Sequence, residues 1–378
     1  MSNKKEISLY IHIPFCKQKC FYCDFPSYAN LDNLREDYIN ALCKEIENKA
    51  GEYLIKSIFI GGGTPSYLNS IEIEKILLAI NKLKLDKYVE FTIECNPGTM
   101  DEEKLKTMLR GGVNRISMGL QAVQNHLLKE VGRIHSFNEF KENFMLARKL
   151  GFKNINVDLM FGLPNQKVEE WRESLEVISS LEPEHISAYS LIIEEDTAFY
   201  KLWENNNLLL PSEDEEREMY EITKSILKKY GYRQYEISNY AKDGYECYHN
   251  KVYWKYYNYL GLGSSSTSFI DGKRTKNIVN VKEYIENINL GKDVYEEVSI
   301  NSLQDSMEEF VFMGLRMLDG ISLKEFNKRF GVNIESIYKK IIDKNIDKKL
   351  LVLENDKLKL TEKGVEVSNS VMSDFIII

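Results

Sequence analysis

Long hydrophobic runs are missing from this chain of 378 residues. Its longest unbroken apolar stretches cover only residues 76–80 and 375–378, whereas a membrane-spanning helix needs ~20 apolar residues. The start of the chain has Lys4 and Lys5 but neither an extended apolar region nor a small-residue cleavage site, so we expect no secretory signal. We therefore expect a cytoplasmic protein without a transmembrane segment, which at most associates transiently with a membrane.

An excess of positive charge is missing as well. The chain has 50 Lys and Arg residues against 58 Asp and Glu residues, which gives a formal net charge of −8. Because nonspecific binding to nucleic acid depends on clustered cations, this balance argues against a nucleic-acid partner. With 43% hydrophobic and 29% charged residues the composition is that of a globular protein. At ~150 residues per domain the length predicts one large domain with a smaller one, or two to three modest domains.

Short apolar runs alternate with longer helical patterns up to about residue 230. The six runs are rich in β-branched or aromatic residues and cover residues 7–13, 57–60, 89–94, 115–119, 154–159 and 185–189. Between the first two runs, Ile39, Leu42 and Ile46 follow the 3.6-residue spacing of a helix over residues 35–49. Six strand-helix units predict an α/β fold with parallel strands, either an open sheet or a full or partial barrel. In both architectures the ligand lies at the carboxyl ends of the strands.

Capping signals mark several helix boundaries. Asn69, Thr99 and Ser136 are each followed three residues later by Glu, which is the spacing of a capping box, so we expect helices to begin there. Gly111 and Gly151 stand where helical patterns should stop.

The amino-acid composition changes near residue 240. We interpret residues 1–240 as a barrel domain and the Tyr-rich residues 241–300 as a connecting segment. Residues 301–378 contain three helical patterns, over 305–316, 322–330 and 333–345, and a hairpin pattern over 350–360. This series predicts a winged-helix-like α+β domain. Because it has 12 Lys and Arg residues against 13 Asp and Glu residues, we interpret it as a packing or docking module and not as a DNA-binding one.

Three of the six cysteines lie within eight residues after the first predicted strand. Cys16, Cys20 and Cys23 have the spacing C-x3-C-x2-C, and Pro14 ahead of them favours a loop over a helical face of core cysteines. In a cytosolic chain such crowding indicates a metal or redox site and not a disulfide framework. Structural zinc usually takes four protein ligands, and no fourth follows at a matching spacing. Three thiolates on a four-iron cluster leave one iron open for a substrate or cofactor.

The segment Cys16-Lys-Gln-Lys-Cys20-Phe-Tyr-Cys23 resembles the cluster motif of the radical S-adenosylmethionine (SAM) superfamily. The resemblance implies a 4Fe-4S cluster bound by these three cysteines, with SAM on the open iron. It also implies a partial (β/α)6 radical SAM barrel, which agrees with the six units counted above. In that superfamily reductive cleavage of SAM yields methionine and a 5'-deoxyadenosyl radical, so an electron donor such as flavodoxin or ferredoxin is implied if SAM is cleaved.

Further segments resemble the coproporphyrinogen dehydrogenase-like branch of this superfamily. They are Tyr10-Ile-His-Ile-Pro-Phe-Cys16, Gly61-Gly-Gly-Thr-Pro-Ser66, Glu94-Cys-Asn-Pro97, Ser117-Met-Gly-Leu-Gln121 and Asp158-Leu-Met-Phe-Gly-Leu-Pro164. A glycine triplet lets the backbone approach a ligand, and its amides can receive the amino acid part of SAM; the alternative is a tight strand-to-helix turn. Carboxylates at strand ends suit a ribose diol or an ammonium group. The resemblance implies these SAM contacts: Tyr10, Tyr22, Gly62, Gly63, Thr64, Glu94, Gln121, Arg133 and Asp158.

Two features separate members of the branch. Asp24 and Phe25 follow the third cysteine, where the decarboxylating coproporphyrinogen enzyme usually has a further cysteine two residues on. Residues 249–254 read H-N-x-x-Y-W, and both features resemble the HemW group of heme chaperones. The resemblance implies His249 as a heme ligand; the alternative is a satisfied polar residue in an aromatic core. Cys247 is an alternative heme ligand, although we favour a buried structural thiol. Cys43 and Cys95 are assigned to packing.

The resemblance implies a heme chaperone that binds heme and transfers it to apo-hemoproteins, with SAM chemistry either regulatory or vestigial and no catalytic residue assigned. The alternative from a different class is an oxygen-independent coproporphyrinogen III oxidase (dehydrogenase) that acts by radical SAM oxidative decarboxylation. A third hypothesis is a radical SAM enzyme for an unrelated small substrate, in which the Tyr-rich segment is ordinary core.

Overall fold

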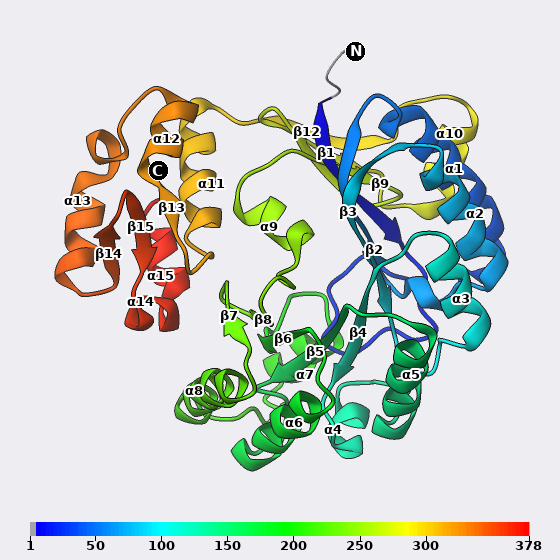
Figure 1. The fold of residues 1–378 in the computed structure, drawn as a ribbon, viewed down its shortest axis with the longest axis horizontal. Helices are drawn as coiled ribbons and strands as arrows, with labels where there is room; N and C mark the ends of the chain where they lie inside the picture. Colours follow the sequence, from blue (N-terminus) through cyan, green and yellow to red (C-terminus); the bar gives the residue numbers. More distant parts are fainter. Residues whose placement is uncertain (1–4, 378) are drawn as a thin grey trace.

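The computed structural model describes residues 5–377 and shows a curved sheet with helices along its outer face (Figure 1). Twelve strands form this sheet in the order β12-β11-β10-β9-β1-β2-β3-β4-β5-β6-β8-β7. Strands β1 to β6 pair in sequence order, and every one of these pairs is parallel. The order begins and ends on different strands, so the sheet is an open, partial barrel. The predicted α/β fold with six strand-helix units is confirmed.

The strand-helix units follow one another without a large insertion. Their elements are β1 (Glu6–Ile13), α1 (Arg35–Ala50), β2 (Leu54–Gly62), α2 (Ser70–Asn81), β3 (Lys84–Cys95), α3 (Glu102–Arg110), β4 (Arg115–Gln121), α4 (Asn125–Glu130), α5 (Phe137–Leu150), β5 (Ile155–Phe161), α6 (Val168–Ser180), β6 (His185–Ser190), α7 (Ala198–Glu204) and α8 (Glu213–Lys229). Two short 3-10 turns, Asp32–Leu34 and Pro65–Tyr67, precede α1 and α2.

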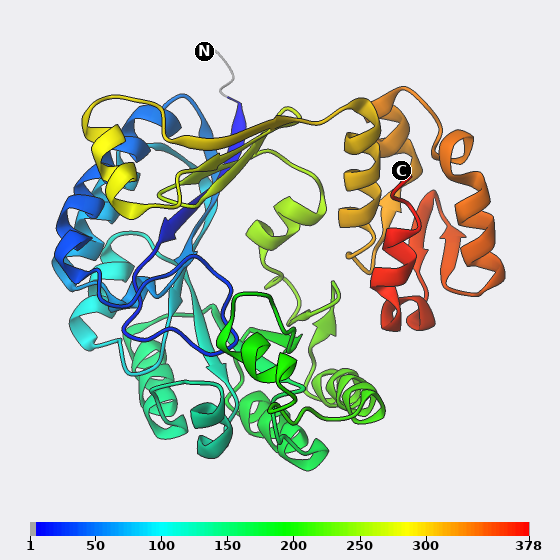
Figure 2. The same cartoon turned by 180° about the vertical axis from the view of Figure 1, so that it is seen from behind.

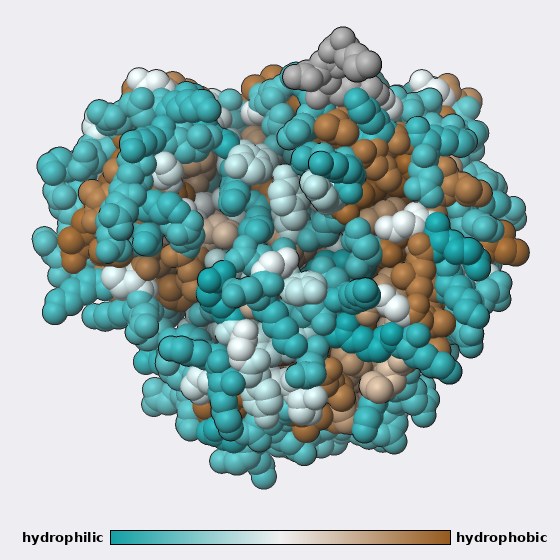
Figure 3. Space-filling view, in the orientation of Figure 1, coloured by the Kyte–Doolittle hydropathy of each residue, from teal (hydrophilic) through white to brown (hydrophobic). Residues whose placement is uncertain are grey.

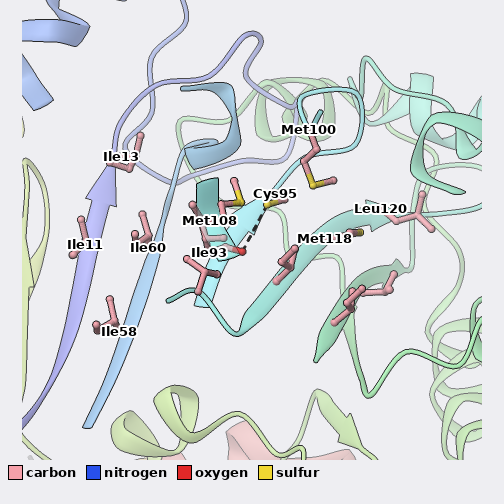
Figure 4. Packing of buried hydrophobic residues seen from close by; sticks show 14 of the residues in the cluster. Ile11, Ile13, Ile58, Ile60, Ile93, Cys95, Met100, Met108, Met118 and Leu120 are labelled. Atoms are coloured by element: carbon pink, nitrogen blue, oxygen red, sulfur yellow. Dashed lines mark hydrogen bonds between the residues drawn. The ribbon is translucent and has the colours of Figure 1, made fainter. Parts of the chain in front are cut away.

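The main core lies between the sheet and the helices that cover it. Alternate residues of the central strands point to the same side because successive side chains of a strand face opposite ways. Ile11 and Ile13 of β1, with Ile58 and Ile60 of β2, are 0 to 2% exposed, and Met108 of α3 packs in the same cluster (Figure 4). Cys95 belongs to this cluster and is 2% exposed, which agrees with its assignment to packing.

The segment predicted as a connector contributes strands to the main sheet. Its elements, with the two short strands before it, are β7 (Arg233–Gln234), β8 (Asn239–Ala241), α9 (Tyr248–Trp254), β9 (Tyr259–Leu262), β10 (Thr267–Ile270), β11 (Lys273–Asn277), α10 (Val281–Asn289) and β12 (Tyr295–Ile300). β9 pairs in parallel with β1, on the edge that β2 leaves open, and β10 to β12 continue the sheet in antiparallel fashion. Helix α9 stands between the sheet and the C-terminal domain in both views (Figures 1 and 2).

The C-terminal domain is winged-helix-like and has its own core. It comprises α11 (Leu303–Gly314), β13 (Ile321–Ser322), α12 (Leu323–Phe330), α13 (Ile334–Asp347), β14 (Leu351–Glu354), β15 (Lys357–Leu360), α14 (Glu362–Glu366) and α15 (Ser368–Ser373). The predicted hairpin is β14–β15, and β13 adds a third antiparallel strand. Phe310, Phe326 and Tyr338 lie in a hydrophobic cluster separate from that of the barrel. Several contacts join the domains: Leu318 N–H donates to Tyr235 O at 3.1 Å, the Arg329 side chain donates from Nη1 to Tyr256 O at 2.9 Å, and Arg274 Nη1 lies 2.9 Å from Glu309 Oε1.

Two of the three predicted capping boxes are present. Asn69 and Ser136 each accept a hydrogen bond from the backbone of a Glu three residues on, and that Glu accepts one in return. The prediction for Thr99 is wrong. Asp101 caps α3 by accepting from Lys104 N–H, while the Thr99 hydroxyl donates to the Asn96 carbonyl at 2.6 Å.

Within residues 5–377, the helices are too short or too polar to cross a bilayer. Hydrophilic side chains cover most of the face seen in Figure 3, where hydrophobic residues form separate patches. The apolar side chains that stabilise the fold are therefore mainly those of the two buried clusters.

Candidate functional site

A cavity of about 390 Å³ lies among the carboxyl-terminal parts of the parallel strands and the loop after β1. Of the thirteen residues predicted for the cluster, SAM and heme, eleven line it: Cys16, Tyr22, Cys20, Cys23, Gly62, Gly63, Thr64, Glu94, Gln121, Arg133 and Asp158. Tyr10 and His249 do not line this cavity. The cavity lies where the strand-end rule predicts a ligand site, and the structure brings together residues up to 142 positions apart in the sequence.

Backbone hydrogen bonds hold the cysteine loop in place. Tyr28 N–H donates to Pro14 O at 2.8 Å, and Cys16 N–H donates to Tyr28 O at 3.1 Å, so the two ends of the loop are joined. His12 is 2% exposed, and its Nε2 lies 2.8 Å from Pro26 O. Phe21 N–H donates to Val131 O at 3.2 Å across the cavity mouth. These bonds fix the thiols without a disulfide.

The three thiols are free and lie within electrostatic range of one another. Burial raises the pKa of Cys16, and it raises the pKa of Cys23 to about 11, with the neighbouring thiols as a further cause. Arg133 opposes this effect: its guanidinium lowers the pKa of Cys16, and its Nη1 lies 3.7 Å from Cys20 Sγ. Across residues 5–377, no three His, Cys, Asp or Glu side chains converge as a single metal ion requires. Separate thiols around one cavity suit a cluster, in which each thiolate binds its own iron.

The glycine triplet brings β2 against the cysteine loop. A Cβ added to Gly63 would lie 2.7 Å from Phe15 O and 3.0 Å from Cys16 Sγ, and one added to Gly62, where φ is 109°, would lie 2.5 Å from the His12 ring. The amides of the triplet have partners within the protein. Gly62 N–H donates to Glu94 Oε2 at 3.2 Å, and Gly63 N–H donates to Ile13 O at 2.8 Å. The triplet therefore allows close packing of β2 on the cysteine loop, and the prediction that its amides receive the amino acid part of SAM stays a prediction.

A pair of carboxyl groups forms the floor of the cavity. Desolvation, reinforced by the charge of Asp158, raises the pKa of Glu94 to about 8. Burial also raises the pKa of Asp158, although Ser117 Oγ donates to it at 3.1 Å and Asn156 Nδ2 at 2.8 Å. The raised pKa favours the protonated form of Glu94, which offers a donor beside an acceptor, an arrangement that suits the hydroxyl groups of a ribose.

Three buried polar atoms on the cavity wall have no hydrogen-bond partner among residues 5–377. They are Ser27 Oγ, Gln121 Oε1 and Arg133 Nε. Gln121 has a φ of 78° at a register shift between β4 and β5, so the backbone is distorted where its side chain enters the cavity. Arg133 is otherwise anchored, by Asn96 Oδ1 at 3.1 Å and Gly119 O at 2.8 Å. Unpartnered buried polar groups are satisfied by a polar ligand, so these residues fit a cluster with SAM.

Sequence reasoning missed some residues of the wall. Asn96, Ser117 and Tyr189 line the cavity, and the first two stand inside motifs that we quoted without assigning them. Tyr189 is next to last in β6, where the strand-end rule could have found it. Tyr10, by contrast, donates its hydroxyl proton to His12 Nδ1 at 2.9 Å on β1, because His12 Nε2 donates to the Pro26 carbonyl.

His249 lies elsewhere, in the interior between α9 and β2. It is 1% exposed, its ring stacks on Phe59 at a centroid distance of 5.3 Å, and burial lowers its pKa to about 3. Nδ1 lies 2.9 Å from Ser57 Oγ, and Nε2 lies 2.9 Å from the Tyr253 hydroxyl. Because Ser57 donates its own proton to Ser8 Oγ at 2.8 Å, Nδ1 donates to Ser57, and the Nε2 lone pair receives the Tyr253 proton. The structure thus shows the satisfied polar residue of the alternative interpretation.

Glu90 of β3 holds the beginning of α9. Its carboxylate accepts from Tyr248 N–H at 2.8 Å and from His249 N–H at 2.9 Å. Cys247 is fully buried, its Sγ lies 3.5 Å from Glu90 Oε1, and burial raises its pKa to about 12. These features are those of the structural thiol that we favoured, because a thiol ligand needs a lowered pKa and access.

Comparison with known proteins covers nearly the whole chain. The profile of the Radical SAM superfamily matches residues 10–178, and that of the HemN C-terminal domain matches residues 301–367. A protein of Bacillus subtilis (strain 168) named "Heme chaperone HemW" is 38% identical over 98% of this chain and 99% of its own length. Its namesake in Escherichia coli (strain K12) is 35% identical over 98% of both chains.

A solved structure shares the fold. Coproporphyrinogen III oxidase (HemN) from Escherichia coli, a radical SAM enzyme, matches with a TM-score of 0.86 over 98% of this chain and 90% of that one, at 21% sequence identity. The radical SAM domain implies a 4Fe-4S cluster and SAM, which the cavity residues fit. Because identity above 30% extends over the full length, the chain belongs to the HemW family of the radical SAM superfamily.

Proposed function

We propose that the protein is a heme chaperone, which binds heme and transfers it to apo-hemoproteins in the cytoplasm. The observation that carries this proposal is the identity of 35 to 38% with proteins named heme chaperones over barrel, α9 and C-terminal domain together. We further propose a domain boundary near residue 300, because the sheet ends with β12 and a second hydrophobic core begins with α11.

In this proposal the barrel cavity holds the cluster and SAM. Cys16, Cys20 and Cys23 are the thiolate ligands, and Arg133 balances part of the negative charge of a thiolate-bound cluster. Glu94 and Asp158 bind the ribose hydroxyls. When bound and reduced, the cluster supplies an electron to SAM, for which flavodoxin or ferredoxin is the proposed donor. Heme transfer itself requires no turnover of SAM.

His249 stays the proposed heme ligand of the family signature. Its Nε2 lone pair must leave the Tyr253 hydroxyl before it binds iron, and the imidazole must leave the interior, where it is 1% exposed. We propose that α9 opens locally when iron is bound, because a helix of seven residues has few backbone hydrogen bonds of its own.

The second candidate is oxygen-independent coproporphyrinogen III oxidase. The whole-chain likeness in fold to HemN favours it, and Asp24 and Phe25 in place of a further cysteine speak against it. One preparation tests both candidates. We expect stoichiometric heme uptake in an absorption titration and no anaerobic conversion of coproporphyrinogen to protoporphyrinogen. Decarboxylation at enzymatic rates would reverse this choice.

A matched pair of variants tests the ligand. We expect His249→Ala to shift the heme absorption spectrum and to weaken heme uptake. His126→Ala, on exposed α4 with a side chain 64% exposed, should leave both unchanged. Equal spectra for wild type and His249→Ala would remove His249 as the iron ligand without affecting the chaperone proposal.

A further inference from the structure

A second and larger cavity, of about 590 Å³, lies between α9 and the C-terminal domain. We call it the interdomain cleft. One wall comes from α9 and the residues after it, with Trp254 and Lys255, and the other from α11, α12 and the turn between them, with Phe310, Met317 and Arg329. Its size is within the ~300–1,000 Å³ range of small-molecule pockets. None of the predicted cluster or SAM residues lines it.

The two faces of α9 have different environments. His249 and Val252 are 1 and 2% exposed and face the barrel interior, where α9 packs on β2. Lys251, Trp254 and Lys255 line the interdomain cleft. The H-N-x-x-Y-W signature is therefore divided: its His lies inside the barrel wall and its Trp lies in the cleft.

The cleft has an aromatic and apolar wall. Phe310, Met317 and Ile321 are 4 to 7% exposed, and Trp254 faces them from α9. The Arg316 guanidinium lies 4.4 Å from the centre of the Trp254 ring, and the indole Nε1 is buried with no hydrogen-bond partner in the described part of the chain. A flat apolar ligand would pack on this wall, because aromatic side chains bind planar π systems by stacking.

The charge of the cleft is opposite to that of the chain. Its lining has five cations, from Arg233, Lys251, Lys255, Arg329 and Lys357, against three carboxylates, whereas the whole chain has a net charge of −8. Arg329 lies over two rings, 5.4 Å from that of Tyr257 and 5.2 Å from that of Phe310. The other four cations pair with the three carboxylates of the lining, as Arg329 does with Glu325 at 2.7 Å. Lys255 forms no ion pair within 4 Å among residues 5–377, so the lining keeps a net positive charge with one unpaired cation, which suits a planar anionic ligand.

We propose that the interdomain cleft is the docking site of the tetrapyrrole, with the macrocycle against Trp254 and a propionate at Lys255. This inference rests on the proposed function, since heme is the ligand. It adds that recognition of the macrocycle and a propionate precedes iron ligation and does not depend on His249. The C-terminal domain then forms half of the binding site.

Iron-free protoporphyrin IX tests the inference, because no iron ligand contributes to its binding. In a fluorescence titration of the full chain we expect Lys255→Glu to raise the dissociation constant on the order of tenfold, since a hydrogen bond to a charged group contributes ~1.5–3 kcal/mol. Lys282→Glu is the matched control, on α10 outside the cleft with a side chain 75% exposed. It makes the same change in net charge and should bind like wild type.

The dimethyl ester of protoporphyrin provides a second comparison. We expect the ester to bind wild type more weakly than the free acid does and to be insensitive to Lys255→Glu, because the propionate charge is absent. Equal affinities of Lys255→Glu and Lys282→Glu for the free acid would overturn the inference while leaving the heme chaperone proposal intact. Failure of wild type to bind both heme and protoporphyrin would instead overturn the proposed function.

Discussion

Gly63→Ala is the substitution whose effect the structure defines best. The added Cβ would lie 2.7 Å from Phe15 O and 3.0 Å from both Ile13 O and Cys16 Sγ, whereas ordinary contact begins at 3.4 Å. Two of these atoms are backbone carbonyl oxygens that accept hydrogen bonds at 2.8 Å, so they cannot rotate away. The cysteine loop must move by about 0.7 Å at Phe15 O and by about 0.4 Å at Cys16 Sγ, its first predicted ligand. Overpacking of this kind typically costs ~1–3 kcal/mol of folding free energy.

Two measurements follow from this displacement. We expect urea unfolding of apo Gly63→Ala to show a loss of ~1–3 kcal/mol, and anaerobic reconstitution to give less iron and sulfide per chain than wild type. Gly51→Ala is the matched control. Gly51 ends α1 with a φ of −62°, and its added Cβ would lie 3.4 Å from Glu47 O, so stability should change by less than ~0.5 kcal/mol. Wild-type stability and full iron content in Gly63→Ala would refute the close-approach argument.

Three further substitutions give distinct results. The folded pKa of Glu94, about 8, lies above its ordinary 4.5, so the apo protein should lose stability as the pH rises from 5 to 8, by at most ~1.4 kcal/mol per pH unit. Glu94→Gln should flatten this part of a pH series of urea unfolding curves; unchanged slopes would contradict the raised pKa. Tyr253→Phe leaves the buried Nε2 of His249 without its donor, which should cost ~1–3 kcal/mol in the same assay, and an unaltered midpoint would show that Nε2 finds another partner. Cys20→Ser should prevent assembly of a normal four-iron centre, and iron analysis with wild-type values would remove Cys20 from the ligand set.

Local sequence patterns predicted the strands and helices of the barrel well, because the apolar runs and the capping residues that define these elements lie within a few residues of one another. The six apolar runs became β1 to β6, each extended by a few residues, and Asn69 and Ser136 cap helices as expected. The error at Thr99 has a local cause too. Asp101 stands two residues later and is an equally good cap, while the Thr99 hydroxyl is taken by the Asn96 carbonyl. Spacing alone did not decide between two adjacent candidates.

Pairing between distant segments could not be predicted in this way. β9 pairs with the free edge of β1, although the two strands are at least 246 residues apart in the sequence. No feature of either strand indicates which strand it pairs with. Residues of the cavity wall could be predicted where motifs mark the carboxyl ends of strands. The prediction missed Tyr189, which lines the cavity but belongs to none of the motifs. The hydrogen bonds that occupy the Gly62 and Gly63 amides also depend on neighbours brought together by the sheet.

Helix α9 shows why a recognised motif does not predict which of its side chains are buried and which line a cavity. Helical periodicity indicates that residues 249, 252 and 253 share one face and that 251, 254 and 255 lie on others, but it does not say which face meets the barrel. The orientation of the helix depends on Ser57 and Phe59 of β2, some 190 residues earlier in the sequence. Ser57 forms a hydrogen bond with the His249 ring, and Phe59 stacks on it. A ligand that approaches from solvent therefore meets the Trp254 side of the helix first. The signature thus combines His249, whose ring is buried in the barrel wall, with Trp254, which lines the interdomain cleft.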